Sequence, residues 1–222
     1  MRKFLTKIGL IFLLSFVTEP ARSEIVFGLL EGYSQGVLTR KTVEKFTTFS
    51  TLATLGYKIG KFDVHGFFQS MDLDYGSGDS SYKGVYATTG IGVGYKLLPS
   101  QIGVISFAVQ RPLSATYIIL SQTTANVKGV AYQHSELTSL QGGSAWQIIA
   151  GYDFLIYGRG TTRKGENFSL GAHLGYLNQD FKIQSTRIKT NNSELAPVSS
   201  GSEKVNYSLS ILSLYFCINY DI

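Results

Sequence analysis

The sequence holds one cysteine, four prolines and no apolar run long enough to cross a membrane as a helix. Its single cysteine, Cys217, excludes a disulfide framework within one chain and is expected to be a small apolar residue on a strand. One cysteine and three histidines at these spacings predict no metal cluster of the Cys/His type. No helix-length segment shows 3.6-residue periodicity with caps. The sequence therefore argues against both disulfide-stapled and helical folds.

The N-terminal segment has the features of a secretory signal peptide. Residues 2–7 include three basic side chains, residues 8–17 (IGLIFLLSFV) are apolar, and small residues stand at 21 and 23. A transmembrane helix needs ~20 apolar residues, so this run is too short to be an anchor. No cysteine follows it to carry a lipid. We predict a signal peptide over residues 1–23 and one domain over residues 24–222.

Charge gives no support for a nucleic-acid partner. The chain has 20 basic and 15 acidic residues, and residues 1–23 account for four of the basic and one of the acidic side chains. The remainder carries a net charge of about +2. No basic stripe with interleaved aromatic residues is present. We therefore predict no binding of nucleic acid.

Composition and periodicity predict β-structure. The chain has 24 Gly, 14 Tyr and 14 Phe, and aromatic residues favour pleated surfaces. Eight segments alternate strictly between two faces, with one face apolar and the other small, polar or occasionally charged. The alternation is weakest in residues 24–33, where neither face is clearly polar. The eight segments are residues 24–33, 46–59, 62–70, 85–97, 102–110, 145–157, 168–177 and 209–222.

The connections between these segments alternate in length. The shorter ones are residues 60–61, 98–101 and 158–167. The longer ones, rich in Ser, Thr, Gly, Asn and charge, are residues 34–45, 71–84, 111–144 and 178–208. Short periplasmic turns and long extracellular loops are typical of outer-membrane barrels. With eight strands, both chain ends are expected on the periplasmic side.

A soluble eight-stranded barrel is the rival fold, and the polar face decides against it. The outside of a soluble barrel is expected to carry Lys and Glu at many positions. Here the polar face is mostly Gly, Ser and Thr, which suits the crowded interior of a small barrel. The apolar face is therefore predicted to meet lipid. Aromatic residues at strand ends are expected at the two membrane interfaces. They are Tyr57, Phe62, Tyr95, Phe168 and Tyr220 on the periplasmic side, and Trp146 and Tyr176 near the outer rim.

The last segment carries the most specific signal. Leu214, Phe216, Ile218, Tyr220 and Ile222 share one face up to the final residue. This pattern resembles the C-terminal insertion signal of bacterial outer-membrane barrels, which usually ends in an aromatic residue, so Ile222 departs from it. The chain as a whole resembles the small barrels of the opacity-protein and outer-membrane protein X and W types, and the barrel domain of outer-membrane protein A.

That resemblance implies an all-β, eight-stranded, antiparallel up-and-down transmembrane β-barrel in the bacterial outer membrane. It also implies contact with outer-membrane lipids and lipopolysaccharide, and insertion by the outer-membrane assembly machinery. The resemblance is architectural. No subfamily motif matches, so no functional residue is carried over from it.

Several inward positions are charged. A buried charge needs a partner, so Lys–Asp pairing is expected in the lumen. Asp63 follows Lys58 closely through the turn at residues 60–61, and Lys96 and Asp153 both lie low in the predicted barrel. We interpret these charges as structural pairs rather than an ion path, because eight strands leave no wide channel. The inward candidates are Lys58, Asp63, His65, Lys96, Asp153, His173 and Asp221.

The sequence predicts no catalytic, cofactor-binding or metal-binding residues. His134, Ser135 and Glu136 are consecutive, but they lie in a predicted surface loop, where a solvated segment is the simpler interpretation. Residues 116–120 (TYIIL) either present an edge for strand addition or make the barrel taller. We predict a non-catalytic outer-membrane protein with a structural or surface-binding role through its long extracellular loops, and no cofactor. A lipid A-modifying barrel enzyme and a narrow pore are the alternatives.

Overall fold

The computed structural model describes residues 23–39, 43–77, 80–97, 103–127, 130–157, 167–190, 193–194 and 207–221. The predicted signal peptide lies outside these residues, apart from Ser23, which begins the first strand. No helix among the described residues is long and apolar enough to span a membrane.

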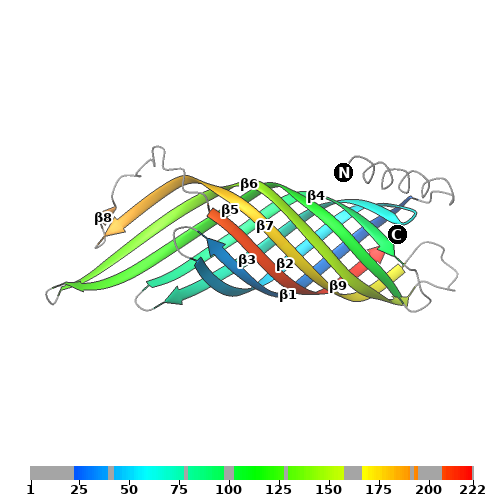
Figure 1. Ribbon diagram of the computed structural model, residues 1–222, viewed down its shortest axis with the longest axis horizontal. Helices are drawn as coiled ribbons and strands as arrows, with labels where there is room; N and C mark the ends of the chain where they lie inside the picture. Colours follow the sequence, from blue (N-terminus) through cyan, green and yellow to red (C-terminus); the bar gives the residue numbers. More distant parts are fainter. Residues whose placement is uncertain are drawn as a thin grey trace, which may run out of the picture.

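Eight long antiparallel strands close into a barrel, as the sequence predicts (Figure 1). Each strand pairs with its neighbours along the chain, and β9 pairs with both β7 and β1 to close the sheet. A ninth strand, β8 (Ser193–Glu194), pairs with the end of β7. The long strands are β1 (Ser23–Thr39), β2 (Val43–Ile59), β3 (Phe62–Ser77), β4 (Ser80–Leu97), β5 (Gly103–Val127), β6 (Val130–Tyr157), β7 (Asn167–Thr190) and β9 (Tyr207–Asp221).

The strands are staggered around the barrel. A path from partner to partner begins at Ile25 and returns to β1 at Gln35, ten residues farther along the strand. Such a stagger tilts the strands against the barrel axis and leaves just enough interior for side chains. The path runs through Tyr57, Val64, Val93, Val109, Ile148, Tyr176 and Leu212. All of these residues lie on the outer face of the barrel.

An apolar belt surrounds the barrel, and the predicted orientation of the two faces is confirmed. Every long strand contributes large hydrophobic side chains that are exposed, whereas the residues between them are buried inside. Only water-free surroundings stabilise such an exterior. One exposed member from each strand is Phe27, Leu55, Val64, Ile91, Phe107, Phe154, Leu174 and Phe216.

The strand ends agree with prediction at one end of the barrel and differ at the other. We call the end that holds Ile25 and Asp221 the lower end and the opposite end the upper end. All eight strands begin or end within two residues of the predicted positions at the lower end. At the upper end, three of the predicted long loops are wrong. The strands on either side of each predicted loop are longer than expected. Only residues 40–42 separate β1 from β2, residues 78–79 separate β3 from β4, and residues 128–129 separate β5 from β6.

The fourth predicted loop, residues 178–208, is also partly strand, because β7 runs to Thr190 and β9 begins at Tyr207. Above the belt the outward face carries more polar side chains, for example Asp74, Lys83 and Lys182, all exposed. A strand with a polar outer face resembles a loop in composition. The upper hairpin of β5 and β6 reaches beyond the other strands, at the left of Figure 1.

The upper lumen is filled by large aromatic and aliphatic side chains. Tyr86 faces inward, as the alternation of residues 85–97 predicts, whereas Tyr117 and Phe181 lie in segments that were predicted to be loops. All three are at most 1% exposed and pack together. The ring centroid of Phe181 lies 6.0 Å from that of Tyr86 and 5.8 Å from that of Tyr117. The inside of the barrel is therefore divided into an apolar upper part and a polar lower part.

Aromatic residues lie at both edges of the belt, with one correction. Trp146 and Tyr176 are exposed near the upper edge, with ring centroids 5.3 Å apart. Tyr57 is exposed at the lower edge, as predicted. Phe62 was expected to face the membrane interface too, but it is buried, because its ring packs against Tyr95 with centroids 4.7 Å apart just after the turn. That turn includes Gly60, whose φ of 62° is in the region that favours glycine.

Glu31 is a charged residue within the belt. It is exposed between Leu29 and Tyr33 on the outer face of β1, and its register partner on β9 is Phe216. An acidic group that faces lipid lowers the stability of a membrane barrel. We expect Glu31→Leu to raise the free energy of unfolding by about 1 kcal/mol, measured by urea titration of the protein folded in lipid vesicles. Gln35→Leu, at the upper edge of the belt on the same strand, should have the smaller effect; an equal gain would contradict the assignment of Glu31 to lipid.

Candidate functional site

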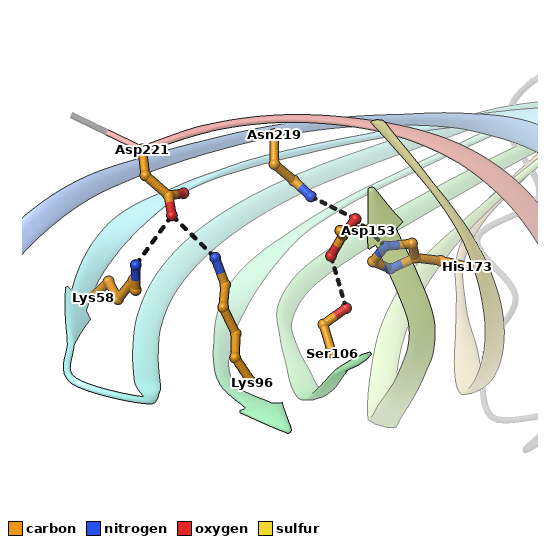
Figure 2. A network of polar contacts seen from close by, with 7 residues as sticks. All are labelled: Lys58, Lys96, Ser106, Asp153, His173, Asn219 and Asp221. Atoms are coloured by element: carbon orange, nitrogen blue, oxygen red, sulfur yellow. Dashed lines mark hydrogen bonds and ion pairs between the residues drawn. The ribbon is translucent and has the colours of Figure 1, made fainter. Parts of the chain in front are cut away.

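The lower lumen contains a network of polar side chains (Figure 2). Nearest the lower end, the amine Nζ atoms of Lys58 and Lys96 lie 3.2 and 3.1 Å from Oδ2 of Asp221. These contacts join β2, β4 and β9 across the lumen, and Asp221 is 5% exposed. The predicted Lys–Asp pairing is confirmed. The single carboxylate of Asp221 contacts both cations. The sequence pointed instead to Asp63 for Lys58, which it follows closely, and to Asp153 for Lys96, because both were predicted low in the barrel.

Asp153 on β6 is the centre of the second part of the network. Its Oδ1 atom lies 2.8 Å from Nε2 of His173 and accepts a hydrogen bond of 2.9 Å from the Asn219 amide. The hydroxyl of Ser106 donates to Oδ2 over 3.1 Å. Four strands, β5, β6, β7 and β9, thus meet at one carboxylate that is 4% exposed. Three hydrogen-bonding neighbours stabilise a buried negative charge.

A third group lies on the part of the wall that β3 and β5 form. Nδ1 of His65 lies 2.5 Å from Oδ1 of Asp63, and Nε2 of the same ring lies 2.9 Å from the amide nitrogen of Gln110. The amide donates there, so Nε2 accepts and Nδ1 carries the proton towards the carboxylate. This arrangement fixes the tautomer of His65. All seven charged or histidine residues predicted to face inward therefore do so, and they form three groups.

Glycines make room for these side chains. A Cβ atom at Gly92 would lie 2.4 Å from Nε2 of His65, and one at Gly94 would lie 2.1 Å from a carboxylate oxygen of Asp63. Both distances are shorter than any real Cβ contact, so larger residues cannot replace these glycines without displacing the polar groups. Gly92 and Gly94 of β4 therefore leave the space that the side chains of His65 and Asp63 occupy.

A small cavity of about 80 Å³ lies among these groups in the lower lumen. Polar lining residues include Asp63, His65, Lys96, Asp153 and His173. A volume of this size holds a few water molecules or one hydrated ion. The cavity is lined from above by apolar side chains, among them Leu30, Leu52 and Ile149.

A layer at mid-height separates the cavity from the apolar upper lumen. The phenol of Tyr215 stands at its centre, where it receives hydrogen bonds from Ser50 at 3.0 Å and from the amide of Gln69 at 2.9 Å. Tyr215 and Gln69 are fully buried. Leu30, Leu52, Phe67, Ile149 and Cys217 pack around this phenol.

The triplet His134, Ser135 and Glu136 does not lie in a loop as predicted, but on β6 above the belt. Ser135 and Glu136 are consecutive in an extended strand, so their side chains point to opposite faces. Glu136 accepts a hydrogen bond of 3.0 Å from the Thr138 hydroxyl. This geometry does not bring a serine and an acid together.

The edge proposed at residues 116–120 is also absent. Each of these residues has a register partner on β4 and another on β6. The segment makes the barrel taller, which was the second of the two interpretations.

In a closed eight-stranded barrel each long strand is hydrogen-bonded to a neighbour on both sides, so no unpaired edge faces lipid. The apolar belt outside and the polar lower lumen inside fit the same environment. The chain has the architecture of a bacterial outer-membrane β-barrel. No protein-family model and no curated protein sequence matches it.

Solved structures of three bacterial proteins are similar to this chain at low identity. Neisserial surface protein A is 10% identical, with a TM-score of 0.45, and the match covers 87% of this chain and 95% of that one. The attachment invasion locus protein Ail of Yersinia pestis is 11% identical, with a TM-score of 0.38 over 87% and 99% of the two chains. The outer-membrane protease OmpT of Escherichia coli is 9% identical, with a TM-score of 0.35 over 94% and 100%. At these values no activity is transferred to this outer-membrane barrel.

Proposed function

We propose that this chain is a non-catalytic, non-conducting outer-membrane protein that binds a partner at the cell surface through the strands above the membrane. A signal peptide over residues 1–23 exports it, the outer-membrane assembly machinery inserts it, and lipids and lipopolysaccharide surround its belt. The observation that carries the proposal is an apolar patch on the outer face of the upper wall. The patch consists of Val85, Ile118, Leu120 and Leu137.

The patch lies above the belt on three neighbouring strands. Ile118 on β5 is the register partner of Val85 on β4, and Leu120 is the partner of Leu137 on β6. Val85 is 53% exposed, Ile118 46% and Leu137 39%. Polar residues such as Ser114 and Thr116 are exposed between the belt and the patch on β5. Apolar surface outside the lipid marks a binding site for another molecule.

The upper wall is a firm support for this patch. From Leu113, near the upper edge of the belt, β5 continues to Val127, which is about 45 Å of extended chain at ~3.3 Å per residue. Residues 116–123 of β5 pair on both sides, with β4 and with β6. Paired strands hold exposed side chains in place better than a loop does.

The surface role is tested with Ile118→Ser/Leu137→Ser, which replaces two of the four patch residues without changing the lumen. Bacteria that display the native barrel should adhere to immobilised proteins with exposed apolar surface several times more than bacteria that display the variant. Heat-dependent migration on gels and equal amounts in the outer membrane establish that both are folded. Equal adhesion of the two strains would refute a surface role for the patch.

The filled lumen predicts that the barrel does not conduct ions. Tyr86, Tyr117 and Phe181 seal the upper half, and eight strands leave no room beside them. Purified protein in planar bilayers should give no discrete conductance steps. Regular steps that scale with protein concentration would instead support the narrow pore, and the sealed lumen would then be the wrong description.

A further inference from the structure

We propose that Asp153, His173 and Cys217 form a binding site for a single transition-metal ion, of which Zn²⁺ is the best match, in the lower lumen. A carboxylate oxygen of Asp153, a ring nitrogen of His173 and Sγ of Cys217 lie within 4.8 Å of one another. All three residues are buried. The site is independent of the surface patch proposed above, so either can fail without the other.

The barrel builds this cluster from three neighbouring strands. Gly171 on β7 is the register partner of both Asp153 on β6 and Cys217 on β9, and His173 follows two residues later on β7. Residues two apart on a strand point to the same face, so all three side chains converge over Gly171. A Cβ atom at Gly171 would lie 2.3 Å from Oδ1 of Asp153 and 3.1 Å from Nε2 of His173. The missing side chain at this position is what lets the three donors meet.

The distances require only a small rearrangement for binding. Zinc bonds of about 2.0–2.1 Å to N and O and 2.3 Å to S place tetrahedral donors roughly 3.3–3.8 Å apart. The present contact between Asp153 and His173 is 2.8 Å, so these two atoms separate slightly while Cys217 moves closer. The Ser106 hydroxyl already donates to Oδ2 of the carboxylate, and the Asn219 amide donates to Oδ1. Such outer hydrogen bonds orient a metal ligand.

The donor set selects the metal. One thiolate, one imidazole and one carboxylate suit a borderline-soft ion such as Zn²⁺ and disfavour Mg²⁺ and Ca²⁺, which prefer oxygen donors alone. The adjoining cavity of about 80 Å³, lined by all three residues, has space for a water molecule as fourth ligand. Binding converts the Cys217 thiol to a thiolate, so one proton is released to solvent for each ion bound.

The test uses Co²⁺ as a spectroscopic probe with the protein folded in detergent micelles. We expect one Co²⁺ per chain, with the thiolate-to-metal absorption band that requires a sulfur ligand, and displacement of Co²⁺ by Zn²⁺. Cys217→Ser should abolish the band, and His173→Gln should weaken binding at least about tenfold. His65→Gln is the matched control: it removes a lumenal histidine of the other wall and should keep the band.

A measurement on the native chain guards against variants that fail to fold. X-ray absorption of the Zn²⁺-loaded protein should show one sulfur and two or more nitrogen or oxygen neighbours. Absence of sulfur from that shell, lack of the Co²⁺ band in the folded native protein, or an equal loss of binding in His65→Gln and His173→Gln would each overturn the proposal.

Discussion

Replacing Phe216 by arginine should destabilise the barrel by about 1–3 kcal/mol. A cation that faces the middle of a bilayer costs about 2–4 kcal/mol, and an ion pair with Glu31, the register partner on β1, offsets part of that cost. Phe216 is 72% exposed on β9, and its outward neighbours Leu214 and Ile218 are apolar. Its partners in the sheet are Glu31 on β1 and Ala172 on β7. The measurement is the free energy of unfolding of the variant and the native protein in lipid vesicles, by urea titration with fluorescence detection.

The control for this prediction is Gln35→Arg. Gln35 is exposed on β1, next to β9, but at the upper edge of the belt, where an arginine costs about 0–1 kcal/mol. A second variant, Ser34→Arg, is not a suitable control, because Ser34 is buried and its hydroxyl lies 2.7 Å from that of Ser213 in the lumen. If Phe216→Arg and Gln35→Arg lower stability equally, the belt does not face lipid.

The second large effect is expected at Asp221. Replacing it by leucine removes the carboxylate oxygen that both Lys58 and Lys96 contact, so two ammonium groups remain close together with their shared partner lost. Removing one partner of a buried charge pair costs roughly 3–5 kcal/mol, which we reduce to about 2–3 kcal/mol because the lysine side chains are 19% and 23% exposed. Refolding of the purified protein into vesicles and urea titration measure the loss.

A triple variant distinguishes charge from packing. Adding Lys58→Met and Lys96→Met to Asp221→Leu removes all three charges and keeps apolar stems in place, so most of the lost stability should return. No recovery in the triple variant would mean that the Asp221 side chain stabilises the lower end by some means other than charge pairing. Because refolding is done with purified protein, any effect of position 221 on recognition by the assembly machinery does not enter the result.

Strand alternation determined most of the fold. In β9, Leu214, Phe216 and Ile218 alternate with Tyr215 and Cys217, and the structure exposes the first set and buries the second. The period of two in a strand leaves no other way to place an apolar face. The same periodicity correctly assigned the inward direction of Lys58, His65 and Asp153. It failed in residues 111–144, which are predicted to be a loop, because exposed polar residues such as Ser114 and Thr116 interrupt the apolar face before Ile118 and Leu137.

The sequence by itself determined an eight-stranded barrel, which side of each strand meets lipid, and that charges inside it must pair. Only the tertiary structure decided which charges pair and which lumenal side chains lie in contact. The partners of Asp221 are 163 and 125 positions away in the chain. Cys217, predicted from sequence to be a small apolar residue on a strand, lies beside Asp153 and His173 because the register of β6, β7 and β9 brings their positions around Gly171. Register across a closed sheet links residues at separations that no local spacing encodes, and it is this register that creates the lumenal site.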